Sequence, residues 1–191
     1  MGSSCPRLES LTDSAPSSFC VIVLLQTVSK ILERVIASCL SPLAPIAGLV
    51  KRNQCDPLPS LSTLNICAAL SLEIRPLQRP ALKASTLFLD IKGGFDNISC
   101  LVLTSLLRYK GIPHYLVSWV GSFLTETKCR LVFQDSTNVF LPVQVGTLQG
   151  SPVSPLLFVI YVSVLHIPIP CGIMFSYVDN FTITLGSWSS Q

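Results

Sequence analysis

Residues 173–185 read IMFSYVDNFTITL, and this stretch decides the expected fold. It consists of two apolar runs, rich in β-branched and aromatic residues, on either side of Asp179 and Asn180. Such runs around an Asp-Asn pair are typical of a β-hairpin. Residues 85–90, STLFLD, predict a further short strand that ends in Asp90. We therefore expect a small antiparallel sheet with two carboxylates on its rim.

The two rim carboxylates, Asp90 and Asp179, are candidate metal ligands. Mg²⁺ is a hard ion that prefers oxygen ligands, and grouped carboxylates provide them. Two such ions about 3.5–4 Å apart can activate a primer hydroxyl and hold a departing pyrophosphate. The ordinary alternatives are a strand-ending Asp that serves as a cap and an Asp-Asn turn without chemistry. The spacing along the chain does not decide between them, because it does not fix the distance between the side chains.

The rest of the chain alternates between helical periodicity and loop signals. Apolar residues recur at helical spacing over 28–40, and Pro42 is expected to end that helix. Asp96 or Asn97 is expected to cap a helix that stops before Gly111. The other expected elements are a loose tail at 1–18, a strand or buried helix start at 19–25, a loop at 41–60, a helix at 61–75 with Leu64, Ala68 and Leu72 on one face, helices at 113–124 and 156–166, strands at 129–133 and 139–145 around a polar turn at 134–138, and a Gly/Pro/Ser loop at 146–154.

The composition is unusually apolar. Apolar residues make up 49% of the 191 residues and charged residues only 12%, whereas ordinary soluble domains carry about 25% charged residues. A membrane protein would explain this, but the longest apolar runs, 19–25 and 156–162, are far shorter than the roughly 18–20 residues that span a bilayer. We therefore expect no membrane span, and we favour a protein with a face that packs on a neighbour.

Net charge and cysteine content narrow the class of protein only slightly. The net charge of +3 fits nucleic acid and many other partners. The eight cysteines include no pair with the CxxC spacing of a metal site, and free cysteine behaves as a small buried hydrophobe. Residues 1–18 lack the basic start and apolar stretch of a signal peptide. We therefore expect a reduced intracellular protein of the nucleus or cytoplasm, not a secreted one.

Three segments carry a specific resemblance. Residues 89–97 read LDIKGGFDN, residues 146–158 read GTLQGSPVSPLLF, and residues 177–180 read YVDN. In this order they resemble motifs A, B and C of the reverse transcriptases of non-LTR (LINE-type) retrotransposons, and motif B is the most specific. Supporting matches to that family are SKILERVI (29–36), NQC and SLST within 53–63, and GIPHYLVSWVGSFL (111–124). The resemblance covers about residues 19–187.

The resemblance implies an α+β fold made of the fingers and palm of a reverse transcriptase, with the thumb absent. Residues 1–18 would be a disordered tail, 19–84 the fingers-like region, and 85–191 the palm with motifs A, B and C. The small antiparallel palm sheet would be covered on one face by helices at about 97–110 and 155–166. An open face toward the absent thumb would account for the low charge content, and we expect poor solubility in isolation.

The resemblance also implies roles for particular residues. Asp90 and Asp179 would bind two Mg²⁺ ions, for which Mn²⁺ could substitute. Phe95 would lie under the incoming sugar, where its ring would collide with a 2′-hydroxyl and select deoxynucleotides. The other residues expected to contact the nucleotide, the template base or the primer end are Gln149, Gly150, Ser151 and Tyr177. The basic residues that could contact phosphates of an RNA template and DNA primer are Arg75, Arg79, Lys83, Arg108 and Lys110.

Ordinary alternatives exist for these residues too. Phe95 would otherwise be a core side chain, residues 146–155 a tight loop before a helix, and the basic residues ordinary solvated charge.

One catalytic position departs from the family pattern. Asn180 stands where the second Asp of the Tyr-x-Asp-Asp box is usual, so the catalytic set is Asp90, Asp179 and Asn180. An amide oxygen can bind a metal but carries no charge, and we expect weaker metal binding and slower catalysis. Leu148 stands where motif B usually has Pro, so the loop loses a fixed φ angle.

Three functions fit these observations. The first is an RNA-directed DNA polymerase, and the second is a remnant of the same fold that is inert or only binds nucleic acid. The third is a Mg²⁺-dependent phosphohydrolase that uses Asp90 and Asp179. The order of the three motifs favours the first two over the third, and Asn180 with the missing thumb favours the second over the first. The oligomeric state stays open.

Overall fold

The computed structural model describes residues 3–6, 19–51, 53–55, 63–75, 82–130, 132–133, 136–137, 141–142 and 146–188. By packing, the chain divides into two compact units, each of which combines segments that are far apart in the sequence. The first unit comprises Met1–Leu40 and Phe95–Ser154, and the second comprises Ser41–Gly94 and Pro155–Gln191. Among the described residues, no helix is both long and apolar enough to cross a membrane.

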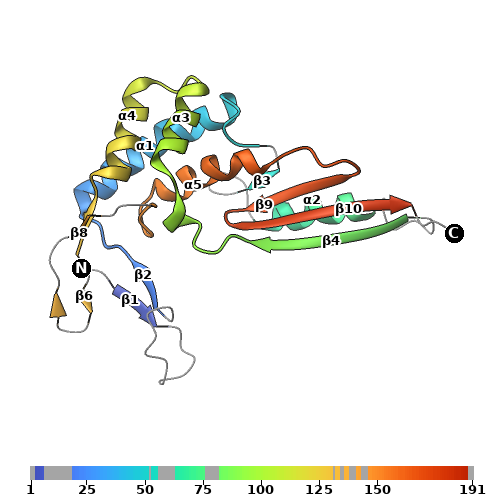
Figure 1. The fold of residues 1–191 in the computed structure, drawn as a ribbon, viewed down its shortest axis with the longest axis horizontal. Coiled ribbons are helices and arrows are strands. Elements are labelled where there is room, and N and C mark those ends of the chain that lie inside the picture. Colours follow the sequence, from blue (N-terminus) through green and yellow to red (C-terminus); the bar gives the residue numbers. More distant parts are fainter. Residues whose placement is uncertain are drawn as a thin grey trace. The chain divides into compact units, whose positions relative to one another are not determined.

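The second unit is built on a four-stranded sheet in the order β3-β9-β10-β4 (Figure 1). The strands are β3 (Gln54–Cys55), β9 (Gly172–Tyr177), β10 (Asn180–Trp188) and β4 (Leu82–Asp90). β10 pairs antiparallel with both β9 and β4, which confirms the predicted three-stranded antiparallel sheet. β3 pairs parallel with β9, in a segment expected to be loop. A two-residue strand is too short to show a period in the sequence.

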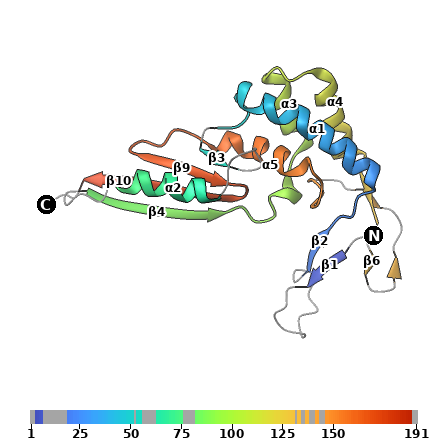
Figure 2. The same ribbon diagram turned by 180° about the vertical axis from the view of Figure 1, so that it is seen from behind.

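Two helices accompany this sheet. α5 (Ser154–Val162) continues into a 3₁₀ turn (Ser163–Leu165), close to the helix predicted over 156–166. α5 is apolar on all sides, and Leu157, Phe158 and Ile160 are almost fully buried, as expected of a core helix. α2 (Thr63–Ile74) confirms the helix predicted over 61–75 and runs along the sheet against β9 (Figure 2).

The outer face of α2 is apolar and exposed. Leu64 is 77% exposed and Leu72 64% exposed, and Ala68 between them is also exposed. The apolar face that the sequence places at these positions is therefore not the face of α2 that lies against the sheet.

The first unit contains a helical hairpin formed by α3 (Cys100–Tyr109) and α4 (His114–Thr125) (Figure 1). Gly111, with φ +74, follows the first helix as predicted, and Pro113 precedes the second. The buried apolar residues of this hairpin are Leu103, Leu107, Ile112, Leu116, Val117, Val120 and Leu124.

The cap of α3 differs from the prediction. The hydroxyl of Ser99 accepts a hydrogen bond from the backbone N–H of Val102 at 3.5 Å, and Ser99 is the N-cap. Asp96 and Asn97 belong to a separate 3₁₀ turn that precedes the helix. The prediction was wrong because that turn, which is held by contacts distant in sequence, delays the helix by two or three residues.

α1 (Thr27–Ile46) continues past Pro42, where we expected it to end. A proline inside a helix removes a hydrogen bond and costs roughly 3 kcal/mol, and α1 contains two of them, Pro42 and Pro45. Leu40 and Ala44, however, are both fully buried. The burial of residues on both sides of Pro42 favours the continued helix over the local preference of proline.

Short paired strands complete the first unit. β1 (Ser3–Pro6) pairs with β2 (Phe19–Ile22), so part of the expected loose tail is paired, while residues 7–18 lie outside the described residues. β5 (Lys128–Cys129) pairs with β8 (Leu141–Pro142), and β6 (Val132–Phe133) pairs with β7 (Ser136–Thr137). β7 lies within the turn predicted at 134–138, so that turn is shorter than expected. Much of the predicted strand at 139–145 lies outside the described residues.

Candidate functional site

A two-residue turn at Val178 and Asp179 joins β9 to β10. Tyr177 and Asn180 are direct cross-strand partners, so the turn lies one residue earlier than the Asp179–Asn180 turn that we predicted. Val178 has φ +52, in the left-handed region where hairpin turns usually place glycine or asparagine. A β-branched residue in this region is strained, and such strain is common at functional sites. The turn therefore holds Asp179 on a constrained backbone.

Asp90, Asn180 and Tyr177 form a row across the end of the sheet. Asn180 pairs directly with Asp90 of β4 on one side and with Tyr177 of β9 on the other. Directly opposed residues in antiparallel strands project to the same face, with Cα atoms about 4.5–5.5 Å apart. The backbone N–H of Ile91 also donates to the carbonyl oxygen of Asp179 at 3.0 Å. The structure thus brings the two predicted metal ligands to one end of the sheet, where Asp90 and Asn180 are exposed.

The oxygen donors at this end of the sheet come from two carboxylates and one amide. Nδ2 of Asn180 donates a hydrogen bond to Oδ1 of Asp179 at 3.1 Å. Carboxylate and amide oxygens both suit Mg²⁺, so the set fits a divalent cation, although only two of its members carry charge. Within the part of the chain that the structure describes, no three or more His, Cys, Asp and Glu side chains are grouped to hold a metal. The site is therefore one charge short of a three-carboxylate set.

The loop that begins at Gly146, in the first unit, is held on one side by the 3₁₀ turn at Phe95. The N–H of Thr147 donates to the carbonyl oxygen of Phe95 at 2.7 Å, and the N–H of Gly146 donates to that of Ile98 at 3.3 Å. Gly146 has φ +88, and a Cβ there would lie 2.6 Å from Cα of Asp96. Glycine is therefore required at this close backbone approach.

The other side of the same loop is held by α1 and the segment that leads into it. The N–H of Val23 donates to the carbonyl oxygen of Gln149 at 2.9 Å. The hydroxyl of Ser151 donates to Oε2 of Glu33 on α1, and both side chains are buried. Gly150, between the two anchored residues, is exposed with φ +104. Burial raises the pKa of the Glu33 carboxyl, and the hydrogen bond from Ser151 partly offsets this rise.

The predicted site residues thus fall into two groups. Tyr177 and the set of Asp90, Asp179 and Asn180 belong to the second unit, whereas Phe95 and the loop at 149–151 belong to the first. Each group is locally compact, and the individual chemical roles stay predictions.

The family of the chain follows from a comparison with known protein families. The family model described as "Reverse transcriptase (RNA-dependent DNA polymerase)" matches residues 12–190. The chain belongs to the reverse transcriptase family. Reverse transcriptases bind nucleic acid and generally use Mg²⁺, which agrees with the oxygen donors at the end of the sheet. A search of curated proteins finds no match.

Solved telomerase structures share the fold. A telomerase from Candida albicans in complex with a TWJ fragment of telomeric RNA matches with TM-score 0.62 and 13% identity, over 88% of this chain and 36% of that one. The Candida tropicalis telomerase in complex with a TWJ fragment of telomeric RNA matches with TM-score 0.59 and 12% identity, over 88% of this chain and 34% of that one. Its apo form matches with TM-score 0.60 and 12% identity, over 82% of this chain and 32% of that one. At these identities the likeness shows the fold alone. The chain spans about a third of the length of these telomerase chains.

Glu33 is a residue of this reverse transcriptase domain that apolar periodicity does not single out. The apolar positions that recur over 28–40 lie largely on an exposed face of α1, since Val28 is 77% and Ile31 60% exposed. The buried stripe instead carries Glu33, Leu40 and Ala44. The signal that could have pointed to Glu33 is its helical spacing to Leu40 and Ala44, which places a carboxylate in line with core residues.

Two more polar residues beside the sheet, one partly and one fully buried, were not predicted from the sequence. Nε2 of His166 lies 2.8 Å from the hydroxyl of Ser176, beside Tyr177 in the sheet. Burial, with a smaller effect of the Lys51 charge, lowers the pKa of His166 to about 4. Gln54 is fully buried, accepts from the N–H of Lys51 at 2.8 Å and donates to the carbonyl oxygen of Val159 at 3.1 Å. Both side chains fix the strands next to the candidate site.

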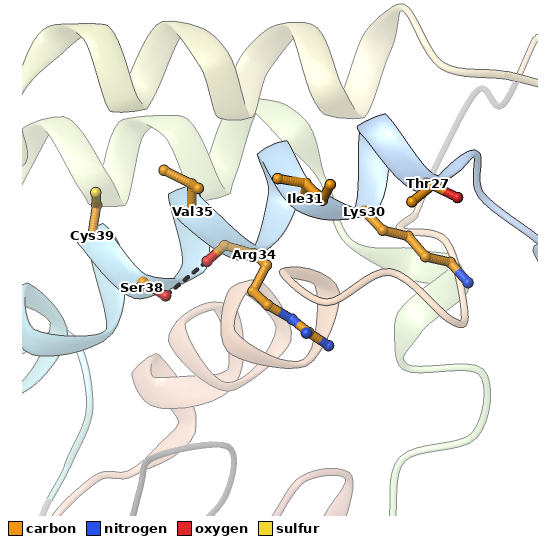
Figure 3. A pocket seen from close by; sticks show the side chains of 7 residues that line it. All are labelled: Thr27, Lys30, Ile31, Arg34, Val35, Ser38 and Cys39. Atoms are coloured by element: carbon orange, nitrogen blue, oxygen red, sulfur yellow. Dashed lines mark hydrogen bonds between the residues drawn. The ribbon is translucent and has the colours of Figure 1, made fainter.

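A hollow of about 510 Å³ follows α1 (Figure 3). Lys30 and Arg34, one helical turn apart, are exposed and extend from the same side of the helix (Figure 3). The other residues that line the hollow are Thr27, Ile31, Val35, Ser38 and Cys39. Neighbouring cations of this kind suit a phosphate backbone, and the ordinary alternative is solvated surface charge.

The structure describes some of the basic residues that we expected to contact phosphates. Arg75 and Arg108 are exposed, and Nζ of Lys110 lies 6.0 Å from the ring centroid of Tyr109. Arg79 and the side chain of Lys83 lie outside the described residues.

Proposed function

We propose that the chain is the fingers and palm part of a non-LTR retrotransposon reverse transcriptase, an RNA-directed DNA polymerase whose catalytic set is impaired by Asn180. The observation that carries the proposal is the row at the end of the sheet, where Asn180 pairs with Asp90 and bonds to Asp179. In this proposal residues 1–18 are a tail, 19–84 the fingers and 85–191 the palm. The retrotransposon origin rests on the finger-type match at 29–36, which lies in α1, and on the match at 111–124 to the segment between motifs A and B, most of which lies in α4.

The second-unit residues have the catalytic roles in this proposal. Asp90 and Asp179 would hold Mg²⁺ or Mn²⁺, and a bound ion would neutralise charge at the reacting phosphate and lower the pKa of the primer hydroxyl. Asn180 contributes an uncharged oxygen, so the attraction of one carboxylate is missing. Tyr177, its direct neighbour across the strands, packs near the primer end.

The first-unit residues receive the deoxynucleotide in this proposal. The ring of Phe95 excludes a 2′-hydroxyl. Gln149, Gly150 and Ser151 form the loop that meets the nucleotide and the template base, and the exposed Gly150 allows close backbone approach.

A second candidate function is nucleic-acid binding without catalysis. The hydrogen bond from Asn180 to Asp179 favours it, because it gives Asp179 a partner in the absence of a metal. In that case the fold would still bind the RNA template and DNA primer, with no turnover.

Primer extension on an RNA template, with deoxynucleotides and either Mg²⁺ or Mn²⁺, tests the proposal. The chain is compared with its Asn180→Asp variant and with an Asp90→Asn/Asn180→Asp double variant. We expect little extension by the chain, at least about tenfold more by Asn180→Asp, since tenfold corresponds to about 1.4 kcal/mol in the barrier, and none by the double variant. Binding of the template–primer is measured in parallel by fluorescence anisotropy.

The outcomes separate the two candidates. Extension by the chain at the level of Asn180→Asp would show that Asn180 is not a defect. Template–primer binding without extension by any of the three proteins would favour the binding function. Neither binding nor extension would contradict both.

A further inference from the structure

We propose that Glu33 is a positioning residue that holds the nucleotide-facing loop at Gln149–Ser151 through the hydroxyl of Ser151. The inference rests on the proposed function for the loop's role, but the contact itself lies wholly within the first unit. The ligand of the loop is a deoxynucleoside triphosphate.

The two partners of the Ser151 hydroxyl determine which hydrogen bond it donates and which it accepts. Its oxygen accepts from the N–H of Val153 at 3.3 Å, and its proton is donated to Oε2 of Glu33. Ser151 is 4% exposed and Glu33 is 5% exposed. Water has little access to either group, so an acceptor at position 33 is needed to satisfy the hydroxyl.

A carboxylate is a costly way to provide that acceptor. Glu33 is buried next to a neutral partner, and among the described residues no basic side chain forms an ion pair with it. Burial of a charge without an opposite charge disfavours the folded state, and a buried polar pair can often be replaced as a whole by apolar side chains at little cost. The pair of Glu33 and Ser151 therefore contributes little to global stability, and its contribution lies in the hydrogen bond that holds the loop.

The two anchors leave one residue of the loop free to meet a ligand. Gln149 is held through its carbonyl oxygen by the N–H of Val23, and Ser151 is held by Glu33. Both anchors are supplied by residues 23–33. Gly150 between them is exposed, with a backbone conformation that favours glycine. Loss of either anchor would therefore make the loop more mobile at Gly150.

Hydrogen exchange of residues 146–153, together with binding of a fluorescent deoxynucleoside triphosphate, tests the inference on the full chain. Glu33→Leu and Ser151→Ala should each speed exchange of this segment, and the double variant should add little to either, because both remove the same bond. Glu33→Gln should stay close to the original chain, since its amide oxygen accepts the same hydrogen bond. Glu126→Gln, at an exposed glutamate of the same unit, is the matched control.

The expected readouts separate positioning from general stability. The double variant Glu33→Leu/Ser151→Ala should keep the melting temperature, because neither side chain is left without its partner, while it weakens nucleotide binding about tenfold. Glu33→Gln should keep both. Unchanged loop exchange in Glu33→Leu, or equal loosening by Glu33→Gln, would overturn the inference. Loosened exchange with unchanged nucleotide affinity would also overturn it. If the original chain binds no nucleotide, the proposed function fails, while the exchange data still decide whether Glu33 holds the loop.

Discussion

At the scale of single residues, Asn180 changes the balance between stability and metal binding. Its amide donates to Oδ1 of Asp179 at 3.1 Å, a bond that an ionised carboxylate at position 180 could not make. An aspartate there would instead place three negative side chains at the end of the sheet, and like charges at this distance repel without a cation. We therefore expect Asn180 to stabilise the metal-free hairpin and to weaken its attraction for Mg²⁺.

The first prediction concerns the metal-free protein. In the presence of a chelator, Asn180→Asp should lower the free energy of unfolding by about 1 kcal/mol, the size of a cross-strand charge effect. Urea unfolding measures it. The swapped variant Asp179→Asn/Asn180→Asp keeps one amide and one carboxylate at the turn, so it should lose less. Equal stability of Asn180→Asp and the original chain would contradict this reading.

The second prediction concerns His166, whose pKa is lowered to about 4 by burial and by Lys51. An unfolded histidine titrates near 6.5, so between these values the unfolded chain binds more protons than the folded chain. The stability that neutral His166 contributes is present above pH 6.5 and is lost as the pH falls toward 4. His166→Gln should flatten this part of the stability profile in thermal melts. The same slope in both proteins would show that His166 is not its source.

At the scale of elements, the sequence predicted the helix ends and strands that depend on residues close together in the chain. Gly111 ends α3 as expected, Pro113 precedes α4, and the apolar runs of β4, β9 and β10 form strands. Contacts between distant segments decided the rest. α1 passes Pro42 because Leu40 and Ala44 are buried, and β3 exists only through its pairing with β9.

The candidate site also depends on contacts between distant segments, which the sequence did not predict. Strand-end and turn positions made Asp90 and Asp179 candidates, but only the register that pairs Asn180 with Asp90 places them together. Glu33 was missed because apolar periodicity treats a charged residue as outside the core, whereas its partner Ser151 lies far away in the sequence.

The third prediction compares two glycines of the first unit. Gly146 and Gly111 have similar positive φ, +88 and +74, but a Cβ at Gly146 would meet backbone atoms at 2.6 Å, while nothing lies within 4 Å of one at Gly111. Gly111→Ala should cost about 1 kcal/mol from conformation alone, and Gly146→Ala clearly more, because backbone must move. Thermal unfolding and hydrogen exchange of residues 146–151 provide the readouts. Equal losses would show that the close approach at Gly146 is not rigid.

At the scale of the whole molecule, the surface is rich in apolar side chains and poor in charge. Charged residues make up 12% of the chain, and large apolar side chains are exposed on α1, α2 and β4. Phe88, on the edge strand β4, is 70% exposed. Exposed apolar surface of this kind promotes association.

The fourth prediction is that the isolated chain self-associates at micromolar concentration. Light scattering and sedimentation should show species that grow with concentration. Replacement of Val28 and Leu64 by Lys, each at 77% exposure, should reduce the association without lowering the melting temperature. A monodisperse monomer at all concentrations would contradict the prediction.

The most direct test of the central claim is a Mn²⁺ titration followed by electron paramagnetic resonance, in which the signal of free Mn²⁺ reports binding. It compares the chain with Asn180→Asp and with Asp90→Asn. Asn180→Asp should bind Mn²⁺ at least about tenfold more tightly, which corresponds to about 1.4 kcal/mol, and Asp90→Asn should bind more weakly than the original chain. If all three proteins bind Mn²⁺ alike, Asp90, Asp179 and Asn180 do not form a metal site, and the proposed polymerase chemistry is wrong.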